Sequence, residues 1–358
     1  MRSNRILRLL AAFLGALMLV SSAVSCSGPN LSGLSGDELR TYTAMKTEHF
    51  EVTGGMYAYY FFDLGSLYVS EFTEEELAER GFDENKTLKQ QKYDKNRTWF
   101  EYINEFVISE VENVLVWCEA ATAAGITLTN DDYAYVNDTL TGMRVDAVVK
   151  YSLDFETYLD EMYFGYVDEE DVKKVLLMEA LAAKYGAHLT GLINERMTDE
   201  RVNAYLETVE GERDMTPTRN LGHVFSSYTT YDEDQAYENY KTAMTRLQEK
   251  GKTEAALKAI WEEFSEDSHM VYENVKQGEM TGKIDTWLYA EGRAVGDTGI
   301  VSTDDGCHML IYLSEGDPMY IADAKLDLNE IIREEILAEE RAKVKIKMRK
   351  NVCNAINV

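Results

Sequence analysis

Apolar residues recur with helical spacing through much of the first part of the chain. The clearest stretch is residues 99–124, which carries apolar side chains along one face and is followed directly by Gly125. This pattern predicts a long amphipathic helix that ends at Gly125. Its apolar positions are Trp99, Phe100, Ile103, Phe106, Val107, Val111, Val114, Leu115 and Cys118.

Capping residues predict the starts of further helices in the same region. Thr73, Thr129, Asp168 and Thr198 each stand before acidic residues that favour a first helical turn. A helix rich in Tyr and Phe is expected to begin near Met56. We therefore predict a mostly helical domain over residues 41–212.

The pattern changes after residue 216. Short runs of apolar and β-compatible residues occupy 219–226, 300–303 and 307–313, which predicts strands and a hairpin. Helices are expected from Asp232 to about residue 250, from Thr253 to Phe264, and over 285–289. The order of these elements predicts an α+β fold, with a small antiparallel sheet flanked by helices, over residues 216–322.

The last segment, residues 323–358, combines a helix and a strand. Leu328, Ile332 and Ile336 form an apolar stripe, and residues 343–349 then alternate with period two. We expect this strand to pair with a predicted strand at 49–53, so that the segment packs on the helical domain. A solvated basic tail is the alternative.

The first residues have the pattern of an export signal. Three arginines precede the apolar run 9–20, which is too short for a comfortable membrane span. The sequence AVSC at 23–26 resembles the bacterial lipobox, although Ala23 replaces the usual leucine. We therefore expect a lipoprotein signal peptide over 1–25, a lipid such as palmitate on Cys26, and a flexible tether over 26–40 that holds the protein at the extracytoplasmic face of a bacterial membrane. An ordinary secretory signal with an incidental cysteine is the alternative.

Composition and charge exclude several classes of function. The chain has 358 residues, enough for about two domains, and its 64 acidic against 36 basic residues give a net charge of −28. Long-range attraction to nucleic acid is therefore not expected. The cysteines at 26, 118, 307 and 353 show no CxxC spacing. We expect no metal site, no cofactor and no disulfide framework.

Two histidines lie on predicted strands in the second domain, and the motifs around them suggest a family. They are His223 in the sequence HVF and His308 in the sequence GCH. Between them lie FSEDS at 264–268, Gly278 with Met280 and Ile284, and GDTGIVST at 296–303. In this order, the motifs resemble those of parvulin-type peptidyl-prolyl isomerases. The whole chain more loosely resembles extracytoplasmic foldase lipoproteins of the PrsA and SurA type, which implies a SurA-like chaperone domain before the parvulin-like one.

The resemblance implies a prolyl isomerase site. His223, Asp267, His308 and Thr303 would form a polar catalytic floor, and the prolyl ring of the substrate would rest on a group we call the prolyl seat, namely Met280, Ile284 and Tyr289. Rotation about an X-Pro bond makes and breaks no covalent bond, so a nucleophile is unnecessary. The implied partners are unfolded or partly folded exported polypeptides with X-Pro bonds.

One departure from the family leaves a second hypothesis open. Family members usually carry a glycine segment after the position of Ser268, and this chain lacks it. The first hypothesis is a membrane-anchored isomerase that assists the folding of exported proteins. The second is a catalytically weak or inactive parvulin-like chaperone that binds unfolded polypeptides. A third, a solute-binding lipoprotein, is disfavoured because the first half is helical. Residues 226–235 carry no Lys or Arg, which argues against phosphorylated substrates.

Overall fold

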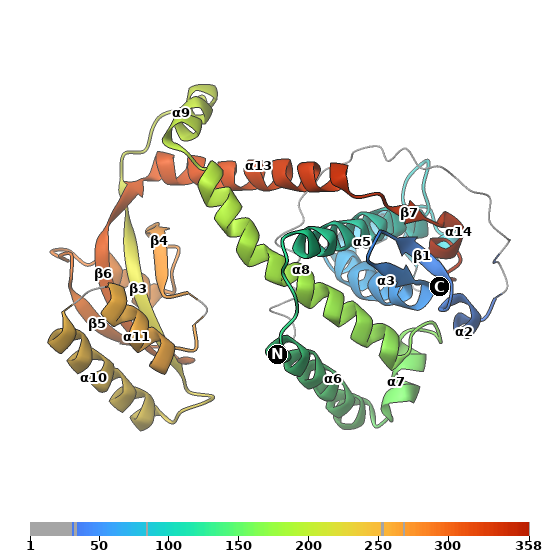
Figure 1. Cartoon of the computed structure of the whole chain (residues 1–358), viewed down its shortest axis with the longest axis horizontal. Coiled ribbons are helices and arrows are strands. Elements are labelled where there is room, and N and C mark those ends of the chain that lie inside the picture. Colours follow the sequence, from blue (N-terminus) through green and yellow to red (C-terminus); the bar gives the residue numbers. More distant parts are fainter. Residues whose placement is uncertain (1–30, 32–33, 84, 252–253, 268, 358) are drawn as a thin grey trace. The chain divides into compact units, whose positions relative to one another are not determined.

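The computed structural model describes residues 31, 34–83, 85–251, 254–267 and 269–357. The described chain divides into two compact units, one formed by residues up to Ile193 with Arg333–Val358 and the other by Asn194–Ile332. Helices and small antiparallel sheets confirm the predicted α+β class (Figure 1). The predicted signal peptide, the lipidation site Cys26 and the cap at Thr253 lie outside the described residues. No helix in the described ranges combines the length and hydrophobicity needed to span a membrane.

Helices make up most of the first unit. The long predicted helix is α5, Trp99–Ala123, and its predicted apolar positions are buried except Phe106 and Val114, which are half-buried. The predicted caps at Thr73, Thr129 and Thr198 are observed, and Gly81 ends the short helix with a φ of 67°. The other elements of the region are α3 Gly54–Val69, α4 Glu74–Glu79, η1 Leu88–Gln90, α6 Asn130–Tyr151, α7 Phe155–Met162 and α8 Glu169–Arg196.

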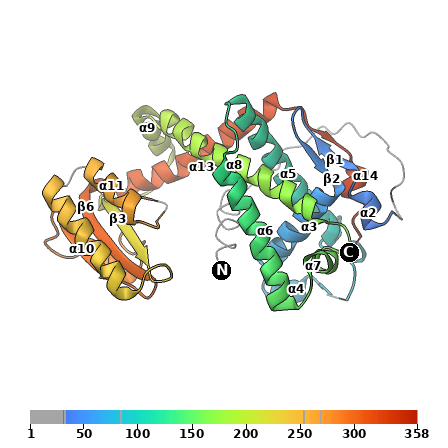
Figure 2. The same ribbon diagram turned by 60° about the horizontal axis from the view of Figure 1, so that its bottom comes forward.

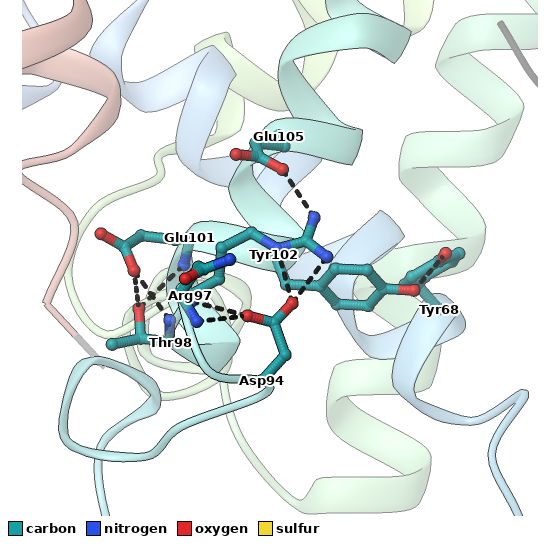
Figure 3. A network of polar contacts seen from close by, with 8 residues as sticks. Tyr68, Asp94, Arg97, Thr98, Glu101, Tyr102 and Glu105 are labelled. Atoms are coloured by element: carbon teal, nitrogen blue, oxygen red, sulfur yellow. Dashed lines mark hydrogen bonds and ion pairs between the residues drawn. The ribbon is translucent and has the colours of Figure 1, made fainter. Parts of the chain in front are cut away.

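The start of α5 is fixed by a network of polar and aromatic contacts. Thr98 and Glu101 form a capping box, in which each side chain accepts a hydrogen bond from the other residue's backbone N–H (Figure 3). The Arg97 guanidinium bonds Asp94 and Glu105 on either side. One turn further on, the Tyr102 hydroxyl lies 2.8 Å from the hydroxyl of Tyr68. This contact joins α5 to α3.

The C-terminal residues complete a small sheet of the first unit, but their pairing differs from the prediction. The strand β7, Lys347–Met348, pairs with β1, Thr43–Lys46, and not with β2, Glu51–Thr53. Both strands flank β1 in the order β2-β1-β7, so the predicted strands share a sheet without touching. The β1 strand was not predicted. After β7, the helix α14, Lys350–Cys353, packs on β1 and α3 (Figure 2).

The expected tether at 26–40 is wrong for its last residues. Ser35 caps a short helix, α2, Gly36–Leu39, and Leu39 is buried. The close fit leaves no room for a side chain at Gly36, where a Cβ would overlap the carbonyl of Gly165. An apolar anchor at Leu39 therefore holds this segment against the core of the first unit.

The second unit is built on an antiparallel sheet with the strand order β4-β3-β6-β5. Successive side chains of a strand point to opposite faces of the sheet. One face is covered by α10 and α11, with Val224, Cys307 and Met309 in its core. The other face is covered by α12 and holds Leu221 and Leu310. The bounds are β3 Pro217–Ser227, α10 Glu233–Lys250, α11 Glu254–Phe264, β4 Val271–Val275, α12 Gly282–Leu288, β5 Thr298–Ser302 and β6 Gly306–Pro318.

The predicted elements around this sheet are present in the predicted order, but β4 was not predicted. Bounds also differ: α12 begins at Gly282, three residues earlier than expected, β5 begins at Thr298, two residues earlier, and β6 runs to Pro318, five residues further. Before the sheet lies α9, Asp199–Thr208. After it, α13, Met319–Lys343, confirms the predicted apolar stripe, since Leu328, Ile332 and Ile336 are all buried.

Candidate functional site

The register of β3 and β6 brings the two histidines together. His308 lies opposite Phe225, and His223 lies opposite Leu310, so the two histidines are diagonal neighbours on the face that α12 covers. Their rings are stacked, with centroids 5.1 Å apart, and His223 Nε2 lies 2.9 Å from His308 Nδ1. The two rings therefore share a hydrogen bond. Cys307, the neighbour of His308 on β6, lies on the opposite face.

Asp267 binds the other side of His223. It lies in the connection between α11 and β4, and its carboxylate accepts a hydrogen bond from His223 Nδ1–H. The Tyr272 hydroxyl donates to the same carboxylate, at 2.8 Å from Oδ2, and the backbone N–H of His269 donates to Oδ1 at 3.2 Å. The connection is itself held to β3, since Met270 O accepts from His223 N–H at 2.9 Å.

Thr303 closes the row of hydrogen bonds at the other end. Its Oγ1 lies 2.9 Å from His308 Nε2, directly after β5. We call the row formed by Tyr272, Asp267, His223, His308 and Thr303 the polar chain. With both rings neutral, Thr303 donates to His308, His308 donates to His223, and His223 donates to Asp267. If His223 carries an additional proton, the donor and acceptor exchange roles in the His223–His308 bond and in the His308–Thr303 bond. Thr303 Oγ1–H then donates to Gly306 O, 3.3 Å away.

The protonation states within the polar chain follow from burial and hydrogen bonding. Burial alone would raise the pKa of Asp267, but the bonds from His223 and Tyr272 outweigh it and lower this pKa to about 2. Burial and the neighbouring His223 lower the pKa of His308 to about 4. At neutral pH, the site therefore holds an ionised carboxylate and a neutral His308. Burial and the Asp267 charge hold the pKa of Tyr272 well above its usual range, so its hydroxyl remains a donor.

The prolyl seat lies on the same face of the sheet as the polar chain. Ile284, on α12, is 3% exposed and belongs to the core of this face, while Met280 and Tyr289 pack against that core. The Tyr289 hydroxyl donates to Val275 O at 2.6 Å, which ties the residue after α12 to β4. The structure therefore brings all seven residues proposed from the sequence to one face. The role of each in catalysis remains a prediction.

Two further contacts place α12 against the sheet. Trp287 lies so close to β5 that a Cβ at Gly299 would overlap its Nε1 atom. Arg219, on β3, donates to Leu288 O at the end of α12, and its guanidinium lies 4.7 Å from the Tyr289 ring centroid. A cation at this end favourably meets the free carbonyls of a helix C-terminus. Both contacts lie at the C-terminal end of α12, and they hold against the sheet the helix that carries Ile284.

Tyr272 is a residue of the site that was not predicted from the sequence. Its hydroxyl donates to Asp267, and its ring meets the His223 ring edge-on at a centroid distance of 5.6 Å. No motif singled it out, because the strand that carries it was not predicted. The signal available in the sequence was its position five residues after Asp267, in a short apolar and aromatic run.

The polar chain is not arranged as a metal site. The imidazole nitrogens of His223 and His308 bond to each other and to Asp267, so they do not converge on a common point. Across the described residues, no group of three or more His, Cys, Asp or Glu side chains could hold a metal ion.

Comparisons with known proteins give distant structural neighbours. No protein family and no curated protein sequence matches the chain. Among solved structures, the chain is similar to PrsA, a peptidylprolyl isomerase from Bacillus anthracis, with 17% identity, 66% of this chain and 96% of that chain covered, and a TM-score of 0.23. For PrsA from Bacillus subtilis, the identity is 17%, the coverage 69% and 86%, and the TM-score 0.33. A SurA-like chaperone from Campylobacter jejuni shares 10% identity over 86% and 98% of the two chains, with a TM-score of 0.24.

Proposed function

We propose that the protein is an extracytoplasmic peptidyl-prolyl cis–trans isomerase that assists the folding of exported polypeptides. The observation that supports this most directly is the polar chain from Asp267 through His223 and His308 to Thr303, on the same sheet face as Met280 and Ile284. An apolar group beside an ionised, hydrogen-bonded floor suits a substrate that has an apolar ring and a polar amide.

The residues of the site would favour a twisted X-Pro amide over a planar one. The planar amide carries more negative charge on its oxygen, and the barrier to rotation is about 20 kcal/mol. An ionised Asp267 near that oxygen would destabilise the planar form more than the twisted one. The two histidines are the buried members of the floor, with His223 5% and His308 9% exposed, so we assign them the task of holding Asp267 and Thr303 in place through their hydrogen bonds.

We further propose that the protein is anchored through Cys26 to the outer face of a bacterial membrane, with unfolded X-Pro-containing polypeptides as partners. The signal-like residues 1–25 and the lipobox-like sequence support this proposal. Mass spectrometry of the protein purified from membranes tests it. We expect a lipid on Cys26 and release of a Cys26→Ala variant from the membrane fraction. An unmodified Cys26 in membrane-bound protein would exclude the lipid anchor.

A chaperone with little or no turnover is the second candidate, and the first unit supplies the observation that favours it. An apolar pocket of about 270 Å³ lies between α3, α5 and the turn after α7, and Phe164 on that turn is 63% exposed. Phe164 also has a φ of 53°, which is unusual for a bulky residue. The lining residues are Phe61, Phe62, Gly65, Ser66, Val69, Leu88, Ile103 and Phe164.

A protease-coupled assay on prolyl peptides, run beside an aggregation assay on an unfolded client, separates the two candidates. The isomerase proposal predicts a rate above the uncatalysed one that scales with enzyme concentration. No rate above background, with aggregation still suppressed, would favour the chaperone. A Phe164→Ala variant should weaken only the suppression of aggregation.

A further inference from the structure

We propose that Tyr272 is a positioning residue of the isomerase site: its hydroxyl holds the Asp267 carboxylate against His223, while its ring forms part of the wall of the prolyl seat. This inference rests on the proposed function. Nothing in the motifs assigns a role to Tyr272, so its place in the site comes from the geometry of β4.

The hydroxyl of Tyr272 contacts both oxygens of Asp267. It lies 2.8 Å from Oδ2 and 3.1 Å from Oδ1, and Oδ2 is also the atom that accepts from His223 Nδ1–H. Asp267 is in a connecting segment, whereas Tyr272 is in the strand β4, which pairs with β3 at Val271, Tyr272 and Val275. A carboxylate on a segment without regular structure thus gains a donor from the rigid sheet, which limits the rotamers it can adopt.

The ring of Tyr272 belongs to the apolar side of the site. On β4, it lies opposite Leu221 of β3, whose side chain is fully buried in the core that α12 covers. The ring packs on this core together with Met280 and Tyr289. It also meets the His223 ring edge-on, with an angle of 69° between the ring planes. One side chain therefore packs through its ring on the core that includes Ile284 and bonds the polar chain through its hydroxyl.

The short connection between Asp267 and β4 makes this contact possible. β4 begins at Val271, and Tyr272 follows Asp267 by five residues. The glycine segment that related sequences carry would fall within this interval. The absence of the glycine segment thus brings the Tyr272 hydroxyl within hydrogen-bond distance of the Asp267 carboxylate.

Tyr272→Phe is the decisive variant, because it removes the hydroxyl and keeps the ring. We expect kcat to fall about tenfold or more, since the lost bond is to a charged group. KM should stay within about twofold because the ring remains, and the acid limb of the pH profile should move upward as Asp267 becomes easier to protonate. Tyr240→Phe is the matched control: Tyr240 is buried on the opposite face of the sheet, so its loss of a hydroxyl should leave kcat and the acid limb unchanged.

Two further measurements make the result independent of activity and of folding. NMR titration of the Asp267 carboxyl carbon should show a higher pKa in Tyr272→Phe than in the wild type and in Tyr240→Phe. Replacing Tyr272 with p-aminophenylalanine, which keeps a ring and a donor, should restore most of kcat. An unchanged kcat and an unchanged Asp267 titration in Tyr272→Phe would overturn the inference. A wild type without isomerase activity would overturn the proposed function, and the titration would then still decide whether Tyr272 controls Asp267.

Discussion

His223 Nε2 lies 2.9 Å from His308 Nδ1, although 85 residues separate the two in the chain. The pair is a product of strand register, because His223 faces Leu310 while His308 faces Phe225. A shift of one residue in either strand would send one ring to the opposite face, among the side chains of α10 and α11. The polar chain therefore depends on the fold of the whole second unit.

Removal of His308 should break the polar chain without unfolding the protein. His308→Ala leaves Thr303 and His223 Nε2 without their partner, and we expect it to cost about 1–3 kcal/mol of stability in the second unit. Isomerase activity should fall at least tenfold. His188→Ala is the matched control, because His188 is exposed on α8, in the first unit, where its ring is tilted by 57° to that of Tyr185. Equal losses in both variants would contradict a role for the polar chain.

The two units should respond to pH in opposite directions. In the second unit, the folded-state pKa values of His308, about 4, and Asp267, about 2, lie below those of the unfolded chain. The unfolded state therefore binds more protons, and stability falls as the pH drops from about 6.5 through 4 and further toward 2. In the first unit, burial raises the pKa of Glu110 to about 8, and burial with the Asp63 charge does the same for Glu179. Folding there binds protons, so stability falls as the pH rises from about 4.5 to 8.

Peptide-resolved hydrogen exchange, corrected for intrinsic rates, measures the two trends separately. Between pH 5 and pH 7.5, we expect protection to rise in β3 and β6 and to fall in α5 and α8. Glu110→Gln should flatten the trend in α5. A parallel response of both units would show that the buried groups do not titrate as described.

Gly299 should be required for the position of α12. Gly299→Ala places a methyl group where Trp287 Nε1 lies, so α12 must move away from β5, at a cost of about 1–3 kcal/mol. Because α12 carries Ile284, KM should rise. Gly282→Ala, at the start of the same helix, meets no atom within 4 Å and should be neutral. Thermal melts and peptide kinetics on both variants test this difference, and equal behaviour would show that α12 adapts without loss.

Met280 is the residue of the prolyl seat best suited to a binding test. It is only partly buried, whereas Ile284 is buried and contributes to folding as well. Met280→Ala should raise KM severalfold with little change in stability. Met244→Ala removes a similarly placed methionine from the opposite face of the sheet and should leave KM unchanged. A KM for Met280→Ala equal to that of the wild type would remove Met280 from the binding surface.

Local chemistry explains which parts of the fold were predictable. The helices that start at Thr73, Thr129 and Thr198 follow from side chains that satisfy the first backbone N–H groups, which is information held within four residues. The strands β1, β4 and β7 are short, and their pairing is decided by distant partners. The alternation of residues 343–349 predicts a strand but does not choose its partner, because the pair β1–β2 offers an edge on either strand. The pairing of β7 with β1 could therefore not be predicted.

The residues of the candidate site that stand in sequence motifs were predictable. These are His223, Asp267, His308 and Thr303, and the structure places them in one row of hydrogen bonds. Tyr272 stands in no motif, and its contact with Asp267 depends on the strand β4 and on the short connection before it. Its role follows only from three-dimensional proximity.

Exchange NMR on a peptide with one X-Pro bond tests the central proposal most directly, because it measures cis–trans interconversion at equilibrium without a coupling protease. If the protein is an isomerase, catalytic amounts of the wild type will produce exchange cross-peaks between the cis and trans signals. Unaided isomerisation, at tens to hundreds of seconds, is too slow to produce them. The His188→Ala control should give the same cross-peaks, and His308→Ala should largely lose them. Absence of cross-peaks with folded wild-type protein, at concentrations where it binds the peptide, would contradict the isomerase proposal.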